Sequence, residues 1–196
     1  GVEPAGAACM KASLEKGEVV TLPHVNTIAD GTAVQTPGSH IFPYIQENLD
    51  EIITVEDDEL IVAFLDMVEN HKMIVENSGL LTVAALRHLD FKNKKVVSIL
   101  SGGNMDVITM SSVVQHGLIQ RDRIFTVSVL IPDKPGELVR VASIIAENQG
   151  NVIKLDHNQF VSTNRNAAVE LKITLEAFGT DHKLSLIHIS EPTRRS

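Results

Sequence analysis

Apolar residues in the first part of the chain fall into short continuous runs and into longer segments with one apolar face. The run Ile52-Ile53-Thr54-Val55 is typical of a buried strand. Asp57 and Asp58 follow this run and are placed to begin a helix, predicted over residues 59–69. Strands that alternate with helices in this way are the pattern of an α/β fold. The same criteria predict a helix over residues 5–16 that ends at Gly17, a strand over 19–22 and a helix over 80–89.

The strongest sign of a binding site lies where the apolar run 96–100 meets the turn Ser101-Gly102-Gly103-Asn104. The run predicts a strand, and Asp106 is placed to cap a helix predicted over residues 107–116. Glycines adopt backbone conformations that other residues avoid, and a helix start offers free amides. The turn can therefore hold the polar edge of a cofactor. Similar turns are also common as plain connections in α/β proteins.

A second pattern begins after the charged joint at residues 121–123. Residues 125–131 alternate between apolar and polar, which predicts a strand. A turn at 133–137 then leads into a helix whose apolar residues over 138–145 share one face. Two further strands are predicted over residues 152–160 and 167–175. This β-α-β-β order is the first two-thirds of a ferredoxin-like unit.

The chain therefore divides into a first domain over residues 1–119 and an incomplete second domain over 120–183. Residues 184–196 break from the pattern and resemble the translation of a transposon adapter used in preparing sequencing libraries. We expect them to be an artefact, with a short native tail as the alternative, and the last helix and strand of the second domain to be missing. Because the chain starts at Gly1 without Met, we expect its beginning to be missing as well.

Composition narrows the class of protein. The 196 residues carry a net charge of −8 and contain no basic patch, which argues against a nucleic-acid binder because phosphates require surplus Lys and Arg. The single cysteine, Cys9, cannot form an internal disulfide. No signal segment and no apolar run long enough to span a membrane occur in the sequence, so we expect a cytoplasmic location.

Five short motifs, taken in order, resemble one known family. They are Gly-Val-Glu-Pro at 1–4, Thr-Ile-Ala-Asp-Gly at 27–31, Val-Glu-Asn-Ser-Gly at 75–79, Leu-Ser-Gly-Gly-Asn at 100–104 and Ile-Pro-Asp-Lys-Pro-Gly-Glu at 131–137. Together they resemble the C-terminal half of a threonine ammonia-lyase (threonine dehydratase) with one C-terminal ACT domain. The resemblance implies the C-terminal part of a fold-type II catalytic domain, a three-layer α/β/α structure, followed by an incomplete ferredoxin-like ACT domain.

The resemblance also implies a reaction. Enzymes of this family use pyridoxal 5'-phosphate, which does the electronic work, to convert L-threonine to 2-oxobutanoate and ammonia. L-serine, which gives pyruvate, is a usual secondary substrate. Serine ammonia-lyases and serine racemases share the catalytic fold and remain alternatives, as does a non-catalytic amino-acid sensor built on the ACT domain. The family's Schiff-base lysine motif lies upstream of every residue present, so we expect this chain alone to be inactive.

The resemblance implies cofactor contacts for six residues. Ser101 would meet the pyridine nitrogen of the cofactor, Glu76 would lie near the ring edge and Gly31 along the ring face. Glu76 could instead cap the helix after Gly79. Asp30 is expected to hold its own loop by hydrogen bonds. The six residues are Ser101, Gly102, Gly103, Asn104, Gly31 and Glu76.

A divalent-metal site of related racemases and dehydratases would use Glu3, the carbonyl of Ala7 and a carboxylate two residues later. The later position holds Cys9 here. Magnesium and calcium prefer oxygen ligands, so we expect no metal at this place. We expect Cys9 to fill a helix face rather than act as a nucleophile.

The ACT resemblance implies a second ligand. Such domains pair and bind amino acids at the turn between strand and helix, here around Asp133, Pro135 and Gly136. Free amides at a helix start suit a ligand carboxylate. Isoleucine or valine is the expected effector of an enzyme that feeds branched-chain synthesis, whereas a catabolic enzyme could use another effector or none. His157 and Asn158 could line this site, although an exposed strand histidine is the more common case. The family also implies a homo-oligomer.

Overall fold

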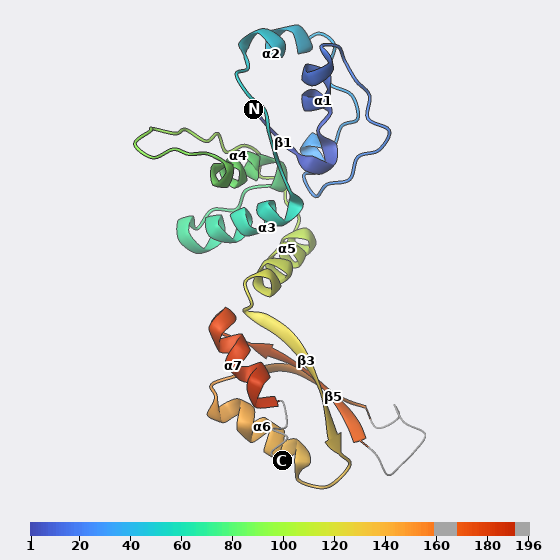
Figure 1. The fold of residues 1–196 in the computed structure, drawn as a ribbon, viewed down its shortest axis with the longest axis vertical. Coiled ribbons are helices and arrows are strands. Elements are labelled where there is room, and N and C mark those ends of the chain that lie inside the picture. Colours follow the sequence, from blue (N-terminus) through green and yellow to red (C-terminus); the bar gives the residue numbers. More distant parts are fainter. Residues whose placement is uncertain (159–167, 191–196) are drawn as a thin grey trace. The chain divides into compact units, whose positions relative to one another are not determined.

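The chain forms two compact units, Gly1–Gly117 and Leu118–Ser196, in a computed structural model that describes residues 1–158 and 168–190. The elements of both units are drawn in Figure 1. Each unit has its own apolar core. Both units combine strands with helices, so the predicted mixed α/β class is confirmed. Among the residues that the structure describes, no helix is both long enough and apolar enough to cross a membrane.

The first unit is built on a pair of parallel strands. β1 (Val2–Pro4) pairs with β2 (Ile53–Val55) over three residues each, and Val55 is completely buried. Parallel strands need a long crossover connection, and here helices lie between and after them. These helices are α1 (Cys9–Lys16), α2 (Phe42–Asn48), α3 (Asp57–Asp66), α4 (Leu81–Ala84) and α5 (Val107–Gln120), with short 3-10 turns at Ala5–Ala7, Asp30–Thr32, Asn77–Leu80 and Ala85–His88 and a π turn at Met67–His71.

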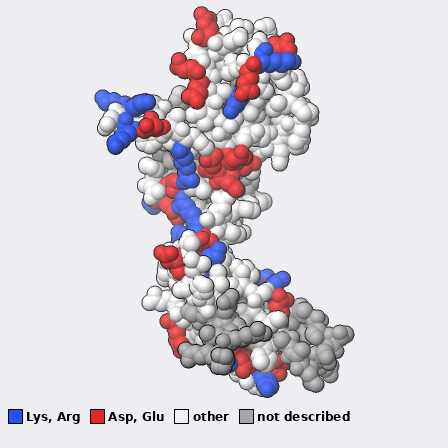
Figure 2. Space-filling model, viewed as in Figure 1, with Lys and Arg blue, Asp and Glu red and all other residues white. Residues whose placement is uncertain are grey.

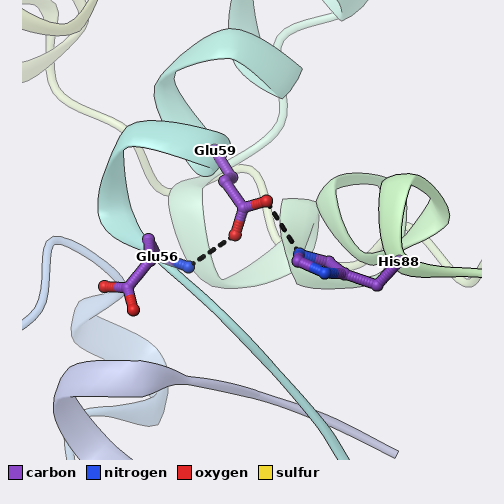
Figure 3. Close-up of polar contacts among 3 residues, drawn as sticks. All are labelled: Glu56, Glu59 and His88. Carbon is purple, nitrogen blue, oxygen red and sulfur yellow. Dashed lines mark hydrogen bonds and ion pairs between the residues drawn. The ribbon is translucent and has the colours of Figure 1, made fainter.

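The start of α3 is fixed by one carboxylate. Glu59 accepts the backbone N–H of Glu56 at 2.8 Å, which satisfies one of the free amides at the helix start. Its other oxygen lies 2.7 Å from Nε2 of His88, in the turn after α4 (Figure 3). Leu60 and Phe64 on the buried face of α3 are completely enclosed. The helix is therefore held by polar contacts at its start and by the core along its length.

Two predicted strands of the first unit do not form. Residues 19–22 make a single backbone bond to a distant segment, Leu22 N–H to the carbonyl of Gln35, and residues 96–100 make no strand ladder. In the latter segment Val97 is 88% exposed, so its apolar side chain has no core to face. A strand requires a neighbouring strand, and among the described residues of this unit only β1 and β2 pair. Both predictions are wrong for this reason.

The predicted helices differ mainly at their ends. The helix predicted over 80–89 is broken into α4 and two 3-10 turns, and the helix predicted over 107–116 continues to Gln120. The helix predicted over 59–69 is α3 followed by the π turn. Gly17 ends α1 in the left-handed conformation, as predicted.

The second unit is an antiparallel sheet with helices on one face. β3 (Ile124–Pro132), β4 (Asn151–Asn158) and β5 (Ala168–Glu176) lie in the order β3-β5-β4. α6 (Glu137–Glu147) and α7 (Thr180–Ser190) lie on one face of the sheet (Figure 1). They contribute Ile145 and Leu186 to the core. The opposite face is polar, with Thr126 opposite Thr174 and Ser128 opposite Lys172. The predicted strand residues 159, 160 and 167 lie outside the described residues.

Residues 184–190, which we expected to stand apart from the fold, belong to α7 in the structure. Leu186 is only 6% exposed and packs in the core of the second unit. The helix that was expected to be missing is thus formed in part by these residues. The physical reason is that Leu186 and the adjacent Ile187 supply apolar surface where the sheet needs a cover.

The start of the second unit is tied to α7 by one carboxylate. Asp122 accepts hydrogen bonds from Lys183 Nζ at 2.5 Å and from Thr180 Oγ1 at 2.8 Å. These two contacts, with that of Lys183 the larger, hold the pKa of Asp122 below its usual value. Lys183 Nζ also lies 5.8 Å from the ring centre of Phe125, a cation–π distance.

Candidate cofactor site

The Ala-Asp-Gly loop is held through the backbone of Ile28. The N–H of Ile28 donates to Oδ2 of Asp57 at 3.0 Å, and its carbonyl accepts from Nδ2 of Asn77 at 3.0 Å. Thr27 Oγ1 also donates to Asp57, at 2.6 Å. Hydrogen bonds made by Thr27, Asp57 and Asn77 thus order the loop. We had expected the side chain of Asp30 to make these hydrogen bonds.

A second segment, residues 76–79, touches the glycine-rich turn at 101–104. A Cβ on Gly79 would lie 1.6 Å from the carbonyl oxygen of Ser101, so the two backbones are in contact. Gly102 has φ +77° and approaches the side chain of Glu76 so closely that a Cβ would lie 2.0 Å from its Cδ. Glu76 Oε2 accepts the N–H of Asn104 at 3.2 Å. Glycine is required at both positions because only its backbone fits.

The same contact decides between two interpretations of Glu76. Its side chain makes no cap bond to the helical turn that follows it, although it occupies the N-cap position. It bonds instead to the turn that contains Asn104. The capping alternative is therefore not observed, and the carboxylate stands between two loops of the site.

The helix after the glycine turn begins as predicted. Asp106 Oδ1 accepts the N–H groups of Ile108 and Thr109, both at 2.9 Å, and its other oxygen accepts the hydroxyl of Thr109. The hydroxyl of Thr109, followed by its N–H, lowers the pKa of Asp106. A negatively charged N-cap interacts favourably with the helix dipole and so stabilises the start of α5.

The three loops enclose a polar hollow of about 420 Å³. Of the six predicted cofactor residues, Gly31, Glu76 and Asn104 line it, whereas Ser101, Gly102 and Gly103 do not. Sequence reasoning missed Asn77, Ser78 and Thr109, which also line it. Asn77 and Ser78 stand inside the motif at 75–79, so the motif itself was a signal for them. No lysine lies among the lining residues.

The hollow fits a polar cofactor in two respects. Gly31 is placed so that a Cβ would meet Ser78 Oγ at 3.0 Å and Glu76 Oε1 at 3.5 Å, and any larger side chain would enter the site. The lining is rich in amide, hydroxyl and carboxylate groups that can bind the polar edges of a ring. Gly31 therefore leaves a space in the hollow that a side chain would fill.

Glu3, which corresponds to a metal ligand in related enzymes, makes backbone contacts here. Both oxygens of Glu3 accept backbone N–H groups of α1, from Met10 and from Lys11, each at 2.9 Å. Cys9 is 2% exposed, and burial, with a smaller effect of Glu3, raises the pKa of its thiol. Ala7 is buried beside it. In residues 1–158 and 168–190, no three His, Cys, Asp or Glu side chains gather in a way that could hold a metal ion.

The predicted effector turn lies at the surface of the second unit. Asp133, Pro135 and Gly136 are exposed, and Gly136 precedes α6 with φ +95°. Next to this turn, between β3 and α6, lies an apolar cavity of about 290 Å³ with Glu137 and Arg140 among its lining residues. His157 is exposed on β4, and the side chain of Asn158 lies outside the described part of the chain.

Charged side chains are mixed on the face of the molecule that Figure 2 presents. Lys and Arg are interspersed with Asp and Glu, and basic side chains gather at the loop between α4 and α5. That loop contains Lys92, Lys94 and Lys95. So small a group beside acidic neighbours is unlike the broad basic surface that phosphate backbones require.

The fold and the polar hollow agree with a comparison at the level of protein families. The model of the pyridoxal-phosphate dependent enzymes matches residues 1–102, more than half of the chain. The chain belongs to this family of pyridoxal-phosphate dependent enzymes, so its cofactor is pyridoxal phosphate. The family resemblance is confirmed for the catalytic part of the chain, which holds four of the five motifs in full or in part.

Within this family, the chain is similar to several proteins whose activities are known by name. An L-threonine ammonia-lyase of Geobacter sulfurreducens is 39% identical over 184 residues, which are 93% of this chain and 46% of that protein. The processed form of threonine deaminase isoform 2 from Solanum lycopersicum has a TM-score of 0.54 and 35% identity over 59% of this chain and 35% of its own. Maize serine racemase has a TM-score of 0.51 and 34% identity over 58% of this chain and 38% of its own. The chain thus spans about half the length of the curated relatives it matches.

Proposed function

We propose that this chain is part of a pyridoxal-phosphate-dependent ammonia-lyase that converts L-threonine to 2-oxobutanoate and ammonia. The observation that carries the proposal is the meeting of three motif loops, 27–31, 76–79 and 101–104, around Glu76. The similarity to an L-threonine ammonia-lyase over nearly the whole chain supports the substrate. L-serine is the proposed side substrate because one methyl group changes binding by only about 1–3 kcal/mol.

The residues of this chain would bind and orient the cofactor. Pyridoxal phosphate, when bound, supplies an electron sink for bond breaking next to the substrate amine. Gly31 would leave room for the ring face, and Glu76 with the N–H of Asn104 would face the ring edge. The family resemblance assigns the pyridine nitrogen to the hydroxyl of Ser101, which stands in the turn that borders the hollow and not in its lining. A hydroxyl does not favour a protonated nitrogen as a carboxylate does, so the ring withdraws fewer electrons and prompt loss of the β-hydroxyl is favoured.

Replacing Ser101 tests this role. We expect Ser101→Asp, in the complete protein, to shift the products of L-serine from pyruvate toward racemised or transaminated products, because a carboxylate stabilises the protonated ring. Chiral chromatography of serine and a keto-acid assay measure the partition, with Ser98→Asp as the control in the same segment. An unchanged partition in Ser101→Asp would count against the role.

Serine racemase is the second candidate function. The structural similarity to maize serine racemase favours it, and the cofactor-site residues of this chain do not separate the two activities. The two reactions give different products from L-serine, namely D-serine and pyruvate. A complete protein that forms D-serine faster than it consumes threonine would support the racemase.

We further propose that the second unit is a regulatory ACT domain that binds isoleucine or valine. An aliphatic side chain suits the apolar cavity beside the turn at Asp133, Pro135 and Gly136. Arg140 Nη1 and Glu137 Oε2, 3.6 Å apart at the cavity, offer opposite charges to an amino-acid carboxylate and ammonium. A non-catalytic sensor would use the same unit.

Calorimetric titration of the chain with isoleucine and valine tests the regulatory proposal. Binding that weakens about tenfold in Arg140→Ala, which removes one charge-assisted contact, is the expected result. The control is Arg121→Ala, outside the cavity lining. If neither isoleucine nor valine binds, the proposal is contradicted.

The cytoplasmic location and the homo-oligomer remain predictions from the sequence.

A further inference from the structure

One amide side chain is enclosed at the centre of the candidate site. Asn77 is 6% exposed, and its Nδ2 donates to the carbonyl of Ile28 at 3.0 Å. Its Oδ1 is buried and has no hydrogen-bond partner within residues 1–158 and 168–190. Buried polar atoms are nearly always paired, and an unpaired acceptor lowers stability. The residue is thus poorly suited to a purely stabilising role.

The bond that Asn77 does make has a specific consequence. Ile28 has both of its backbone polar groups held by side chains, the N–H by Asp57 and the carbonyl by Asn77. Its peptide units on either side are therefore fixed. Ala29, which follows, is completely buried, and a Cβ added to Gly31 would lie 3.0 Å from Ser78 Oγ.

Asn77 also belongs to the segment that touches the third loop. Its neighbours Glu76 and Gly79 contact the turn 101–104 through the N–H of Asn104 and the carbonyl of Ser101. The bond to Ile28 therefore joins the loop 27–31 to a segment already in contact with the glycine turn. All three loops that line or border the hollow meet at this one residue and its neighbours.

We propose that Asn77 is a positioning residue of the cofactor site, kept for the order it gives to residues 27–31 rather than for stability. It acts through the Ile28 carbonyl and does not itself need to touch the cofactor. The effect on loop order stands on the geometry of this chain. Only the effect on the cofactor rests on the proposed function.

Hydrogen exchange of this chain, followed by mass spectrometry, tests the effect on loop order. Asn77→Ala and Asn77→Asp both remove the N–H donor, and the second keeps the shape. We expect exchange of the amides at 28–33 to rise about tenfold, the factor for losing one hydrogen bond that closes the loop. Peptides from α3 should be unchanged. The melting temperature of Asn77→Ala should change little, because the variant removes one unpaired oxygen, Asn77 Oδ1, and leaves another, the Ile28 carbonyl.

Asn48→Ala and Asn48→Asp are the matched controls. Asn48 also donates from Nδ2 to a backbone carbonyl, that of Tyr44 at 2.9 Å, but it is exposed on α2. These variants should leave exchange at 28–33 unchanged. Unchanged exchange in both Asn77 variants would overturn the proposal. A rise of equal size in α3, or failure of both variants to fold, would also overturn it, because either result would mean that Asn77 serves general stability.

The complete protein supplies a readout that a merely structural role would not change. With pyridoxal phosphate added, Asn77→Ala should alter the visible absorbance of the bound cofactor and reduce kcat by about ten- to a hundredfold at an unchanged melting temperature. An unaltered spectrum and kcat would contradict the positioning role. If the wild-type complete protein binds no pyridoxal phosphate, the proposed function fails, while the exchange result still decides whether Asn77 orders the loop.

Discussion

Glycine determines the shape of the site at the scale of single residues. Gly102 adopts φ +77° and lies against Glu76, so a side chain there is opposed both by the backbone conformation and by its neighbour. Gly103, the next residue, has open space around the position of a Cβ. The two adjacent glycines therefore differ in what they can tolerate.

Gly102→Ala should lower the free energy of unfolding by about 1–3 kcal/mol, the usual cost of a left-handed conformation for a residue with a side chain. Gly103→Ala, the matched control, should stay within about 0.5 kcal/mol of the wild type. Urea unfolding followed by circular dichroism measures both variants. Equal losses in the two variants would contradict the difference in backbone conformation and surroundings between Gly102 and Gly103.

Asp122 makes the stability of the second unit depend on pH. Its pKa is lowered in the folded state, so its contribution to stability is present above the unfolded pKa, about 3.9, and is lost as pH falls through the lower folded value. The difference in unfolding free energy between wild type and Asp122→Asn should be constant near neutral pH and shrink in acid. Urea titrations at several pH values measure it, with the exposed Asp50→Asn as control. A difference that grows in acid would contradict this sign.

The roles of single residues were predicted correctly where they depend on contacts with neighbours in the sequence. Asp106 caps α5 and Gly17 ends α1, because both effects depend on neighbours in the sequence. The roles of Asp57 and Asn77 could not be predicted, since each bonds to Ile28 across a long separation in the chain. Asp57 was assigned only to the start of a helix.

At the scale of elements, α3 depends on its first turn. Glu59→Ala removes the acceptor for the Glu56 N–H and the contact with His88, and should lower the unfolding free energy of the first unit by about 1 kcal/mol. Glu47→Ala, an exposed change on α2, should stay within about 0.5 kcal/mol of the wild type. Chemical denaturation measures both variants, and equal stabilities would rule out the importance of this contact.

Strands were predicted correctly where the chain contains both the alternating pattern and a partner strand. The alternation at 125–131 and 168–175 matches paired strands, since Phe125 faces Leu175 and Val127 faces Ile173. The apolar run 96–100 has the same composition but finds no partner strand among the described residues, so it stays irregular. Composition alone cannot supply a neighbouring strand.

At the scale of the whole molecule, the two cores are separate. Leu171→Ala, in a side chain with no exposed surface, should destabilise the second unit by about 2–5 kcal/mol through the cavity it leaves. Hydrogen exchange in increasing urea should then show early opening of β5 and unchanged opening of α3. Phe64→Ala in the first core is the reciprocal variant. Simultaneous opening of both units in each variant would contradict two independent cores.

Our central proposal is that the three loops around Glu76 form the cofactor site of a threonine ammonia-lyase. The most direct measurement is the rate at which the complete protein, expressed from the full reading frame, forms 2-oxobutanoate from L-threonine with and without added pyridoxal phosphate. We predict turnover that depends on pyridoxal phosphate and falls sharply in Gly102→Ala. A complete protein that binds pyridoxal phosphate yet forms no 2-oxobutanoate, or one whose turnover is indifferent to Gly102→Ala, would contradict the proposal.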